Sequence, residues 1–176
     1  MAPIGRSGCP SGTVLENISP DNKAFTITFS EYIAEAGPRI SPRDGRRNCQ
    51  VIVDLNVPQG WQYSLATFDY RGYVLLDEGM QAIHATAYYF QGSEYTGYFS
   101  SLMRGFLDDN YTFRDQIPIE SLVWSSCTAV RSLNINTEIR VRNTDKTLYP
   151  NAQGLITNDS IDGQITHKFG IRWKRC

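Results

Sequence analysis

The chain has 176 residues, 41% of them hydrophobic, and a formal net charge of −1 at pH 7. A chain of this length can fill one hydrophobic core, so we expect a single domain over residues 1–176, with 1–8 as a flexible N-terminal arm. The near-neutral charge argues against nucleic-acid binding, and no apolar run is long enough to form a transmembrane helix.

Four segments alternate apolar and polar residues with a period of two, the pattern of half-buried β-strands. They are residues 25–30, 49–57, 133–141 and 165–174. Turn sequences such as Pro58-Gln59-Gly60 and Asp162-Gly163 separate the alternating runs. The pattern predicts an all-β protein, an antiparallel β-sandwich (jelly-roll-like or Greek-key) of about eight to ten strands. Residues 101–107 are the exception, since they allow one or two helical turns.

The cysteines are even in number and widely spaced: Cys9, Cys49, Cys127 and Cys176. They contain no C-x-x-C pair, so they indicate structural disulfides and an oxidising compartment. Four cysteines allow three pairings. We favour Cys9–Cys49, which would tether the N-terminal arm to a strand, and Cys127–Cys176, which would clamp the C-terminal strand. A redox-active thiol is the alternative, although no partner lies nearby in the sequence.

The start of the chain also fits a secreted protein. Residues 1–5 lack the apolar core of a signal peptide, so we expect a mature chain with the signal removed and Met1 added. Three sequons, at Asn17, Asn110 and Asn158, fit a glycoprotein and predict exposed loops at those points.

Several motifs occur in an order that resembles one known family. They are Gly8-Cys9-Pro10-Ser11-Gly12-Thr13, Arg47-Asn48-Cys49-Gln50, Asp69-Tyr70-Arg71-Gly72-Tyr73-Val74, Trp124-Ser125-Ser126-Cys127, Asp159-Ser160-Ile161-Asp162-Gly163 and Trp173-Lys174-Arg175-Cys176. Together they resemble the fungal secreted proteins of domain of unknown function family 4360, over roughly residues 8 to 176. The resemblance implies a small, secreted, cysteine-bonded protein. It implies no activity, so no catalytic residues are assigned from it.

Catalytic candidates are scarce, because the chain has only two histidines, His84 and His167. His167 falls between Ile165 and Phe169 on the apolar side of its strand, which favours a hydrogen-bonded core histidine over a catalytic or metal-binding one. No Gly-x-Ser-x-Gly elbow is present. We therefore assign no catalytic residue.

Two acidic groups offer oxygen ligands for Ca²⁺: Asp108-Asp109-Asn110, and the pair Asp159 and Asp162. The spacing of an EF-hand is absent, and we favour solvated loops with Asx-turns at both places. We expect no cofactor, with Ca²⁺ as the alternative.

The segment from Tyr88 to Phe113 is rich in aromatic residues. Adjacent tyrosines in a strand point to opposite faces, so some of these rings must face outward. Tyrosine binds sugars and protein surfaces because a flat apolar ring carries a polar tip. The ligand-binding candidates are Tyr88, Tyr89, Tyr95, Tyr98 and Tyr111. Ordinary cross-strand packing is the alternative.

Basic residues form two groups: Arg39, Arg43, Arg46 and Arg47, and the C-terminal Arg172, Lys174 and Arg175. If both groups lay at one end of the sandwich, they would form one patch for an acidic polysaccharide or a membrane headgroup. Separate solvated charges are the alternative.

These features favour a secreted, non-catalytic, effector-like binding protein that acts outside the cell on cell-wall glycans or on a host or competitor protein. A secreted hydrolase that uses carboxylates, and a structural component of a wall or spore coat, are the alternatives. We expect a monomer.

Overall fold

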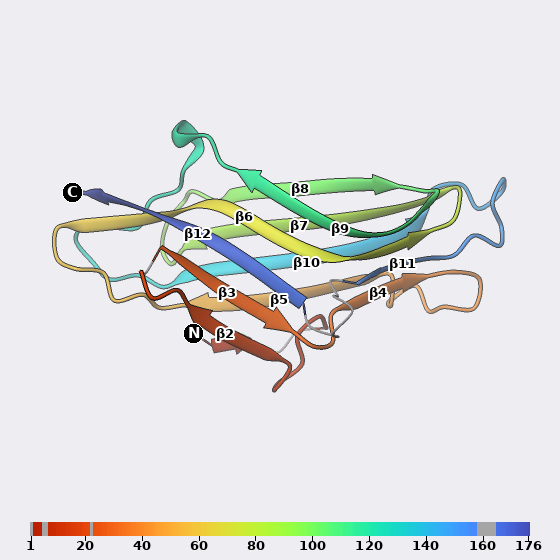
Figure 1. Ribbon diagram of the computed structural model, residues 1–176, viewed down its shortest axis with the longest axis horizontal. Helices are drawn as coiled ribbons and strands as arrows, with labels where there is room; N and C mark the ends of the chain where they lie inside the picture. Colours follow the sequence, from red (N-terminus) through yellow and green to blue (C-terminus); the bar gives the residue numbers. More distant parts are fainter. Residues whose placement is uncertain (1, 5–6, 22, 158–164) are drawn as a thin grey trace.

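The computed structural model describes residues 2–4, 7–21, 23–157 and 165–176, and this part of the chain is built almost wholly of β-strands (Figure 1). The strands are β1 (Ala2–Ile4), β2 (Val14–Ile18), β3 (Ala24–Phe29), β4 (Ile33–Ala36), β5 (Arg46–Val53), β6 (Trp61–Leu76), β7 (Met80–Phe90), β8 (Gly97–Arg104), β9 (Leu107–Gln116), β10 (Leu133–Asn143), β11 (Gly154–Thr157) and β12 (Ile165–Arg175). Within the described ranges, one 3₁₀ turn, Ile119–Ser121, interrupts them.

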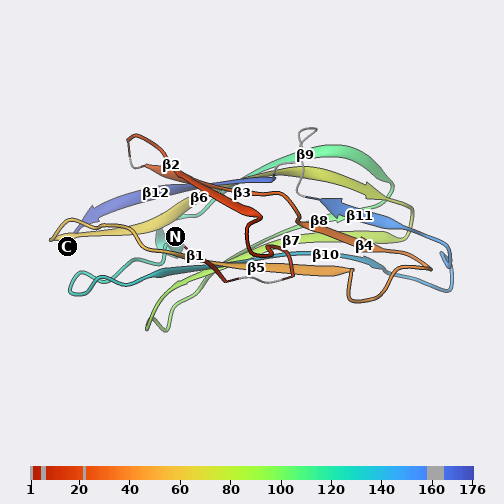
Figure 2. The same ribbon diagram turned by 90° about the horizontal axis from the view of Figure 1, so that it is seen from below.

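The strands form two antiparallel sheets that face each other, as Figure 2 shows from the side. One sheet has five strands in the order β1-β5-β10-β7-β8. The other has seven, built around the 16-residue β6. The first half of β6 pairs with β12, its last residues pair with β11, and β9 pairs along its second half. The fold is therefore the antiparallel β-sandwich that the alternating sequence predicts.

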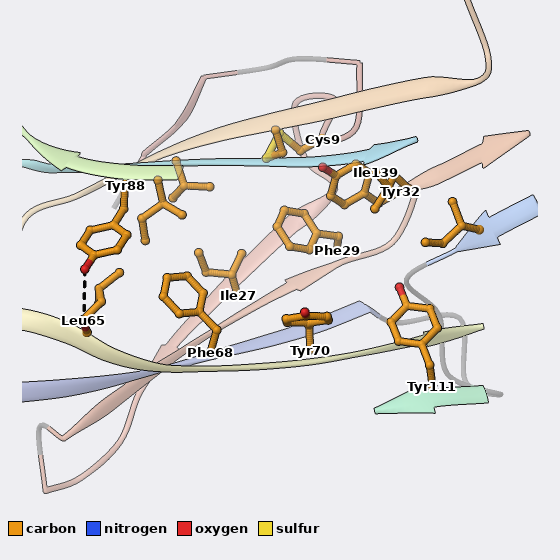
Figure 3. Packing of buried hydrophobic residues seen from close by; sticks show 14 of the residues in the cluster. Cys9, Ile27, Phe29, Tyr32, Leu65, Phe68, Tyr70, Tyr88, Tyr111 and Ile139 are labelled. Carbon is orange, nitrogen blue, oxygen red and sulfur yellow. Dashed lines mark hydrogen bonds between the residues drawn. A yellow bond between two sulfur atoms is a disulfide. The ribbon is translucent and has the colours of Figure 1, made fainter. Parts of the chain in front are cut away.

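Period-two alternation explains how this core forms. Along β7, every second side chain from Met80 to Phe90 is buried, and so is every second side chain of β10 from Leu133 to Val141. The buried positions face the other sheet, where Phe25, Ile27 and Phe29 of β3 meet them. Figure 3 shows Ile27 and Phe29 among the side chains that fill the space between the layers. Burial of such side chains provides the main stabilisation of the sandwich.

One sequence expectation is wrong. Residues 101–107 form no helix: Ser101 to Arg104 belong to β8, which pairs with β7, and β9 begins at Leu107. Phe99 and Met103 pack against the core from alternate positions of β8, so a period of two prevails over the helical one. At the N-terminus, Ala2–Ile4 pair with Ile52–Gln50 of β5 and cover the edge of that strand, while the flexibility of residues 1–8 stays a prediction.

Both disulfides form with the expected pairing, Cys9–Cys49 and Cys127–Cys176. The first is buried in the core. The second joins the exposed end of β12 to the segment that follows the 3₁₀ turn, and the Cys176 N–H donates to the carbonyl of Gly60 at 2.9 Å. The C-terminal strand is thus fixed at its last residue.

Replacing Cys127 and Cys176 together by serine should lower the free energy of unfolding by about 4 kcal/mol, because the bond closes a loop of 49 residues in the unfolded chain. For a domain of this size that loss corresponds to a melting temperature lower by about 8–16 °C. Differential scanning calorimetry of the double variant measures it. An unchanged melting temperature would show that the clamp contributes nothing.

Candidate functional site

Of the five candidate tyrosines, Tyr88 and Tyr111 are not at the surface, because both rings lie in the core. Tyr88 is 0% exposed and Tyr111 is 7% exposed. The Tyr88 hydroxyl donates to the carbonyl of Leu65, and that of Tyr111 donates to the carbonyl of Thr157 at 3.2 Å. Figure 3 shows both rings directed between the sheets. Burial raises the pKa of both phenols.

The close fit of Tyr88 also explains the glycine at the start of β8. A Cβ atom on Gly97 would lie 2.2 Å from Cε1 of the Tyr88 ring, so a larger side chain has no room there. Gly97 and Tyr88 are directly paired neighbours. The inward position of Tyr88 is therefore fixed, and the adjacent Tyr89 must face outward.

Three of the candidate tyrosines do lie at the surface, on or beside the outer face of the five-stranded sheet. Tyr98 of β8 is 65% exposed, and Tyr95 in the β7–β8 turn is 74% exposed. Tyr89 of β7 is half-buried. Tyr98 lies opposite Ala87, two positions from Tyr89 on the same face, so the two tyrosines are diagonal neighbours. We name Tyr89, Tyr95 and Tyr98 the tyrosine face.

Small and amide side chains continue this face along the sheet. Asn136 is exposed and lies opposite Ala87, whereas Asn134, opposite Tyr89, is buried. The next row pairs Ala85 with Ser100 of β8. The small side chains of Ala85, Ala87 and Ser100 leave this part of the face open to a flat ligand. An amide side chain can both donate and accept hydrogen bonds.

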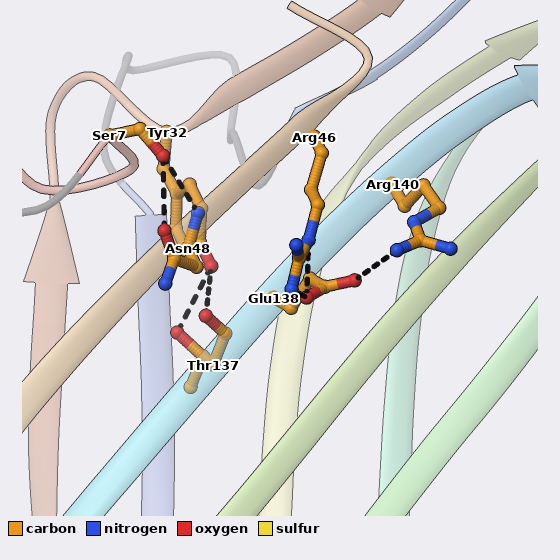
Figure 4. A network of polar contacts seen from close by, with 7 residues as sticks. All are labelled: Ser7, Tyr32, Arg46, Asn48, Thr137, Glu138 and Arg140. Carbon is orange, nitrogen blue, oxygen red and sulfur yellow. Dashed lines mark hydrogen bonds and ion pairs between the residues drawn. The ribbon is translucent and has the colours of Figure 1, made fainter. Parts of the chain in front are cut away.

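A charged network follows beyond the small residues (Figure 4). Glu138 of β10 accepts a hydrogen bond from Nε of Arg46 at 2.7 Å, and Nη2 of Arg140 approaches its other oxygen at 3.4 Å. The Glu138 carboxylate raises the pKa of the Arg46 guanidinium. At the same sheet edge, Ser7 donates to Asn48 at 3.1 Å. Glu138 is therefore engaged by two cations.

A separate groove of about 760 Å³ opens at the end of the sandwich where β12 finishes. Its lining residues are Ile18, Asp54, Leu55, Asn56, Pro58, Trp61, Ile171 and Trp173. Arg175 pairs with Trp61 across β12 and β6, and its guanidinium lies 5.5 Å from the Trp61 ring centre. Asp54 accepts a hydrogen bond from Ser132. Sequence reasoning missed this groove, because the pairing of β6 with β12 unites residues about a hundred positions apart.

The structure describes the side chain of His84 but only the strand position of His167. His84 is buried and stacks on Tyr70 of the opposite sheet, with ring centres 4.1 Å apart and planes 16° apart. Burial lowers the pKa of His84 to about 3, so it stays neutral across physiological pH. His167 occupies a register position between Ile27 of β3 and Tyr70 of β6. Its side chain lies outside the described part, and its expected role as a core residue stays a prediction.

The buried His84 makes stability depend on pH. In the folded state it binds a proton only near pH 3, whereas in the unfolded chain it does so below about pH 6.5. The free energy of unfolding should therefore fall as the pH falls from 6.5 towards 3, by up to about 1.4 kcal/mol per pH unit from this group. Urea unfolding at pH 6.5 and 4.5 should show a drop that is about 2–3 kcal/mol smaller in His84→Phe than in the native chain. Equal drops in both proteins would contradict a neutral core histidine.

The proposed calcium ligands do not form a cluster among the residues that the structure describes. The Asp108 carboxylate accepts a hydrogen bond from the Tyr73 hydroxyl at 2.7 Å, and Asp109 accepts one from the Asn110 N–H. Within the described ranges, no three His, Cys, Asp or Glu side chains gather as metal ligands would. Asp159 and Asp162 lie outside the described residues.

Two of the three sequons are described, and both asparagines are exposed. They lie in strands rather than in the expected loops: Asn17 in β2 and Asn110 in β9. Asn158 lies outside the described part of the chain. Glycosylation at these positions stays a prediction.

The two basic groups lie at opposite ends of the sandwich, so they cannot form one patch (Figure 1). Arg46 begins β5 and pairs with Arg140 near the end of β10. Arg175 ends β12 beside Trp61 at the far end, close to the C-terminus. Cys49 and Cys176, which follow the two basic groups in the sequence, are both disulfide-bonded. The bonds do not bring the two groups together, because the strands place them at opposite ends.

The chain is therefore a disulfide-bonded antiparallel β-sandwich with an exposed sheet face that carries aromatic and polar side chains. It belongs to the family described as Domain of unknown function (DUF4360), whose model matches residues 4–176. An uncharacterized secreted protein of Arthroderma benhamiae is 37% identical over 172 residues, which cover 98% of this chain and 69% of the relative.

Among solved structures, the chain is similar to TmCBM61, determined in complex with beta-1,4-galactotriose. The two are 10% identical, the match covers 94% of this chain and 84% of the other, and the TM-score is 0.30. A score this low does not establish a shared topology. The secreted relative, by contrast, aligns along almost the whole chain. The protein is secreted, and the described residues include no helix long and apolar enough to cross a bilayer.

Proposed function

We propose that this secreted protein acts by binding extracellular glycans through the outer face of its five-stranded sheet. The observation that carries the proposal is the tyrosine face: Tyr98 and Tyr95 are largely exposed, and Tyr89 lies diagonally beside Tyr98 on the same sheet. An exposed ring of this kind offers sugars an apolar surface with a polar tip.

The neighbouring side chains supply the polar contacts that a sugar needs. Asn136 is exposed and lies one strand away, opposite Ala87. Its amide can donate to and accept from hydroxyl groups, which stacking alone cannot satisfy. Asn134, opposite Tyr89, is buried beneath this surface. Because these residues stand on paired strands rather than on loops, their spacing is held by the sheet hydrogen bonds.

The same face favours binding over hydrolysis. A glycosidase requires two carboxyl groups on opposite sides of the scissile bond. Among the outward residues of β5, β7, β8 and β10, Glu138 is the one carboxylate, and Arg46 and Arg140 engage it. The chemistry of this surface is therefore that of recognition.

Retention of the purified protein on insoluble chitin, β-glucan and cellulose tests the proposal. We expect retention on at least one polymer, and a loss of about tenfold in affinity when Tyr95 and Tyr98 both become alanine, because two stacking rings are removed. Phe106→Ala is the matched control, since Phe106 is 82% exposed but lies in the β8–β9 turn, beyond the far end of β8 from Tyr98.

Two results would contradict the proposal. Absence of retention on all three polymers would argue against a wall glycan as the target. Retention that survives in the double tyrosine variant but is lost in Trp61→Ala would place the glycan site in the terminal groove instead of on the tyrosine face.

A further inference from the structure

Four arginines gather on the outer face of the five-stranded sheet, at the end away from the tyrosine face. Arg46 lies opposite Arg140, and Arg140 lies opposite Ile83. Arg142, two positions further along β10, lies opposite Gln81, which in turn lies opposite Arg104 of β8. We name Arg46, Arg104, Arg140 and Arg142 the arginine patch.

The patch has an excess of positive charge. Glu138 is shared by Arg46 and Arg140 and neutralises one of the four guanidiniums. Within the part of the chain that the structure describes, no carboxylate pairs with Arg104 or Arg142. The patch therefore carries a formal excess of three positive charges, in a chain whose total is −1.

Nearby acidic residues do not offset this excess, because their hydrogen bonds direct them elsewhere. Asp77 in the β6–β7 turn accepts from the backbone N–H of Gln153 at 2.8 Å. Glu78 accepts from the Tyr149 hydroxyl at 3.2 Å. Both contacts point to the loop between β10 and β11 rather than to the outer face of β7 and β8.

Arg142 of the patch is also held in place by an uncharged partner. Arg142 is exposed, and its Nε donates to the side-chain oxygen of the buried Gln81 at 2.9 Å, which orients the guanidinium. Like charges on neighbouring strands oppose pairing, so a cluster of four arginines weakens the free sheet. A bound anion relieves that repulsion. Guanidinium groups bind carboxylate and sulfate through two parallel hydrogen bonds.

The arginine patch and the tyrosine face lie on one continuous surface. Tyr98 and Arg104 are both outward residues of β8, six positions apart, or about 20 Å along the strand. Between them, the outward residues of β8 are Ser100 and Leu102, opposite Ala85 and Ile83. An extended polymer lying along β8 would reach both ends of this surface.

We infer that the ligand of this face is an acidic polysaccharide, whose sugar rings stack on the tyrosine face while its carboxylate or sulfate groups bind the arginine patch. The inference rests on the proposed glycan binding and specifies the class of glycan. It assigns roles to Arg104 and Arg142 that only the strand pairing reveals.

Isothermal titration with polygalacturonate and with its fully methyl-esterified form tests the inference, because the two share a backbone and differ in charge. We expect the native protein to bind the acid form at least tenfold more tightly, and more weakly as salt is raised. Arg104→Gln/Arg142→Gln should lose about tenfold in affinity for the acid form. Neither arginine forms an ion pair among the described residues, so the variant should remain folded, and its melting temperature is measured to separate a loss of binding from a loss of folding.

Arg71→Gln/Arg172→Gln is the matched control. It removes two exposed arginines from the seven-stranded sheet and should bind as the native protein does. Equal affinity for the acid and the ester would overturn the inference while leaving glycan binding intact. So would unchanged binding by Arg104→Gln/Arg142→Gln, or equally tight binding of DNA or anionic vesicles. Failure of the proposed function differs, because then neither form of the polymer binds.

Discussion

The packing of the two sheets on each other is the constraint on which the rest of this protein depends. Every inward position of β7 and β10 is used to fill the space between the layers, and this fixes which of two adjacent side chains reaches the surface. Tyr88 enters the core over Gly97, so Tyr89 faces out. Ile139 enters the core, so Glu138 and Arg140 face out together. The composition of the outer face is a consequence of how the core is filled.

The sequence was sufficient to predict the class of fold and the strands that dominate it, because alternation over nine or more residues has one physical explanation. The sequence-based prediction was wrong at residues 101–107, because so short a run is compatible with either a helix or a strand. Pairing with β7 makes residues 101–104 a strand. The sequence could not choose between Tyr88 and Tyr89, since two identical neighbours carry no signal about the phase of the strand.

The sites that depend on strand order were beyond sequence reasoning for a different reason. Arg46, Arg104, Arg140 and Arg142 come from three strands, and nothing local in the sequence says that β10 and β7 lie between β5 and β8. The groove with Trp61 and Trp173 has the same origin. The disulfides were easier to predict, because four cysteines allow only three pairings.

Because recognition is proposed for one sheet face, the most direct test is to map the residues that contact a ligand. Amide ¹H–¹⁵N spectra of the protein titrated with a soluble oligogalacturonate would do so. We expect the shifts to concentrate on β7, β8 and β10, at residues such as Tyr98, Asn136 and Arg142. Shifts confined to Trp61, Asn56 and Ile171 would contradict this proposal, because the ligand would then occupy the terminal groove.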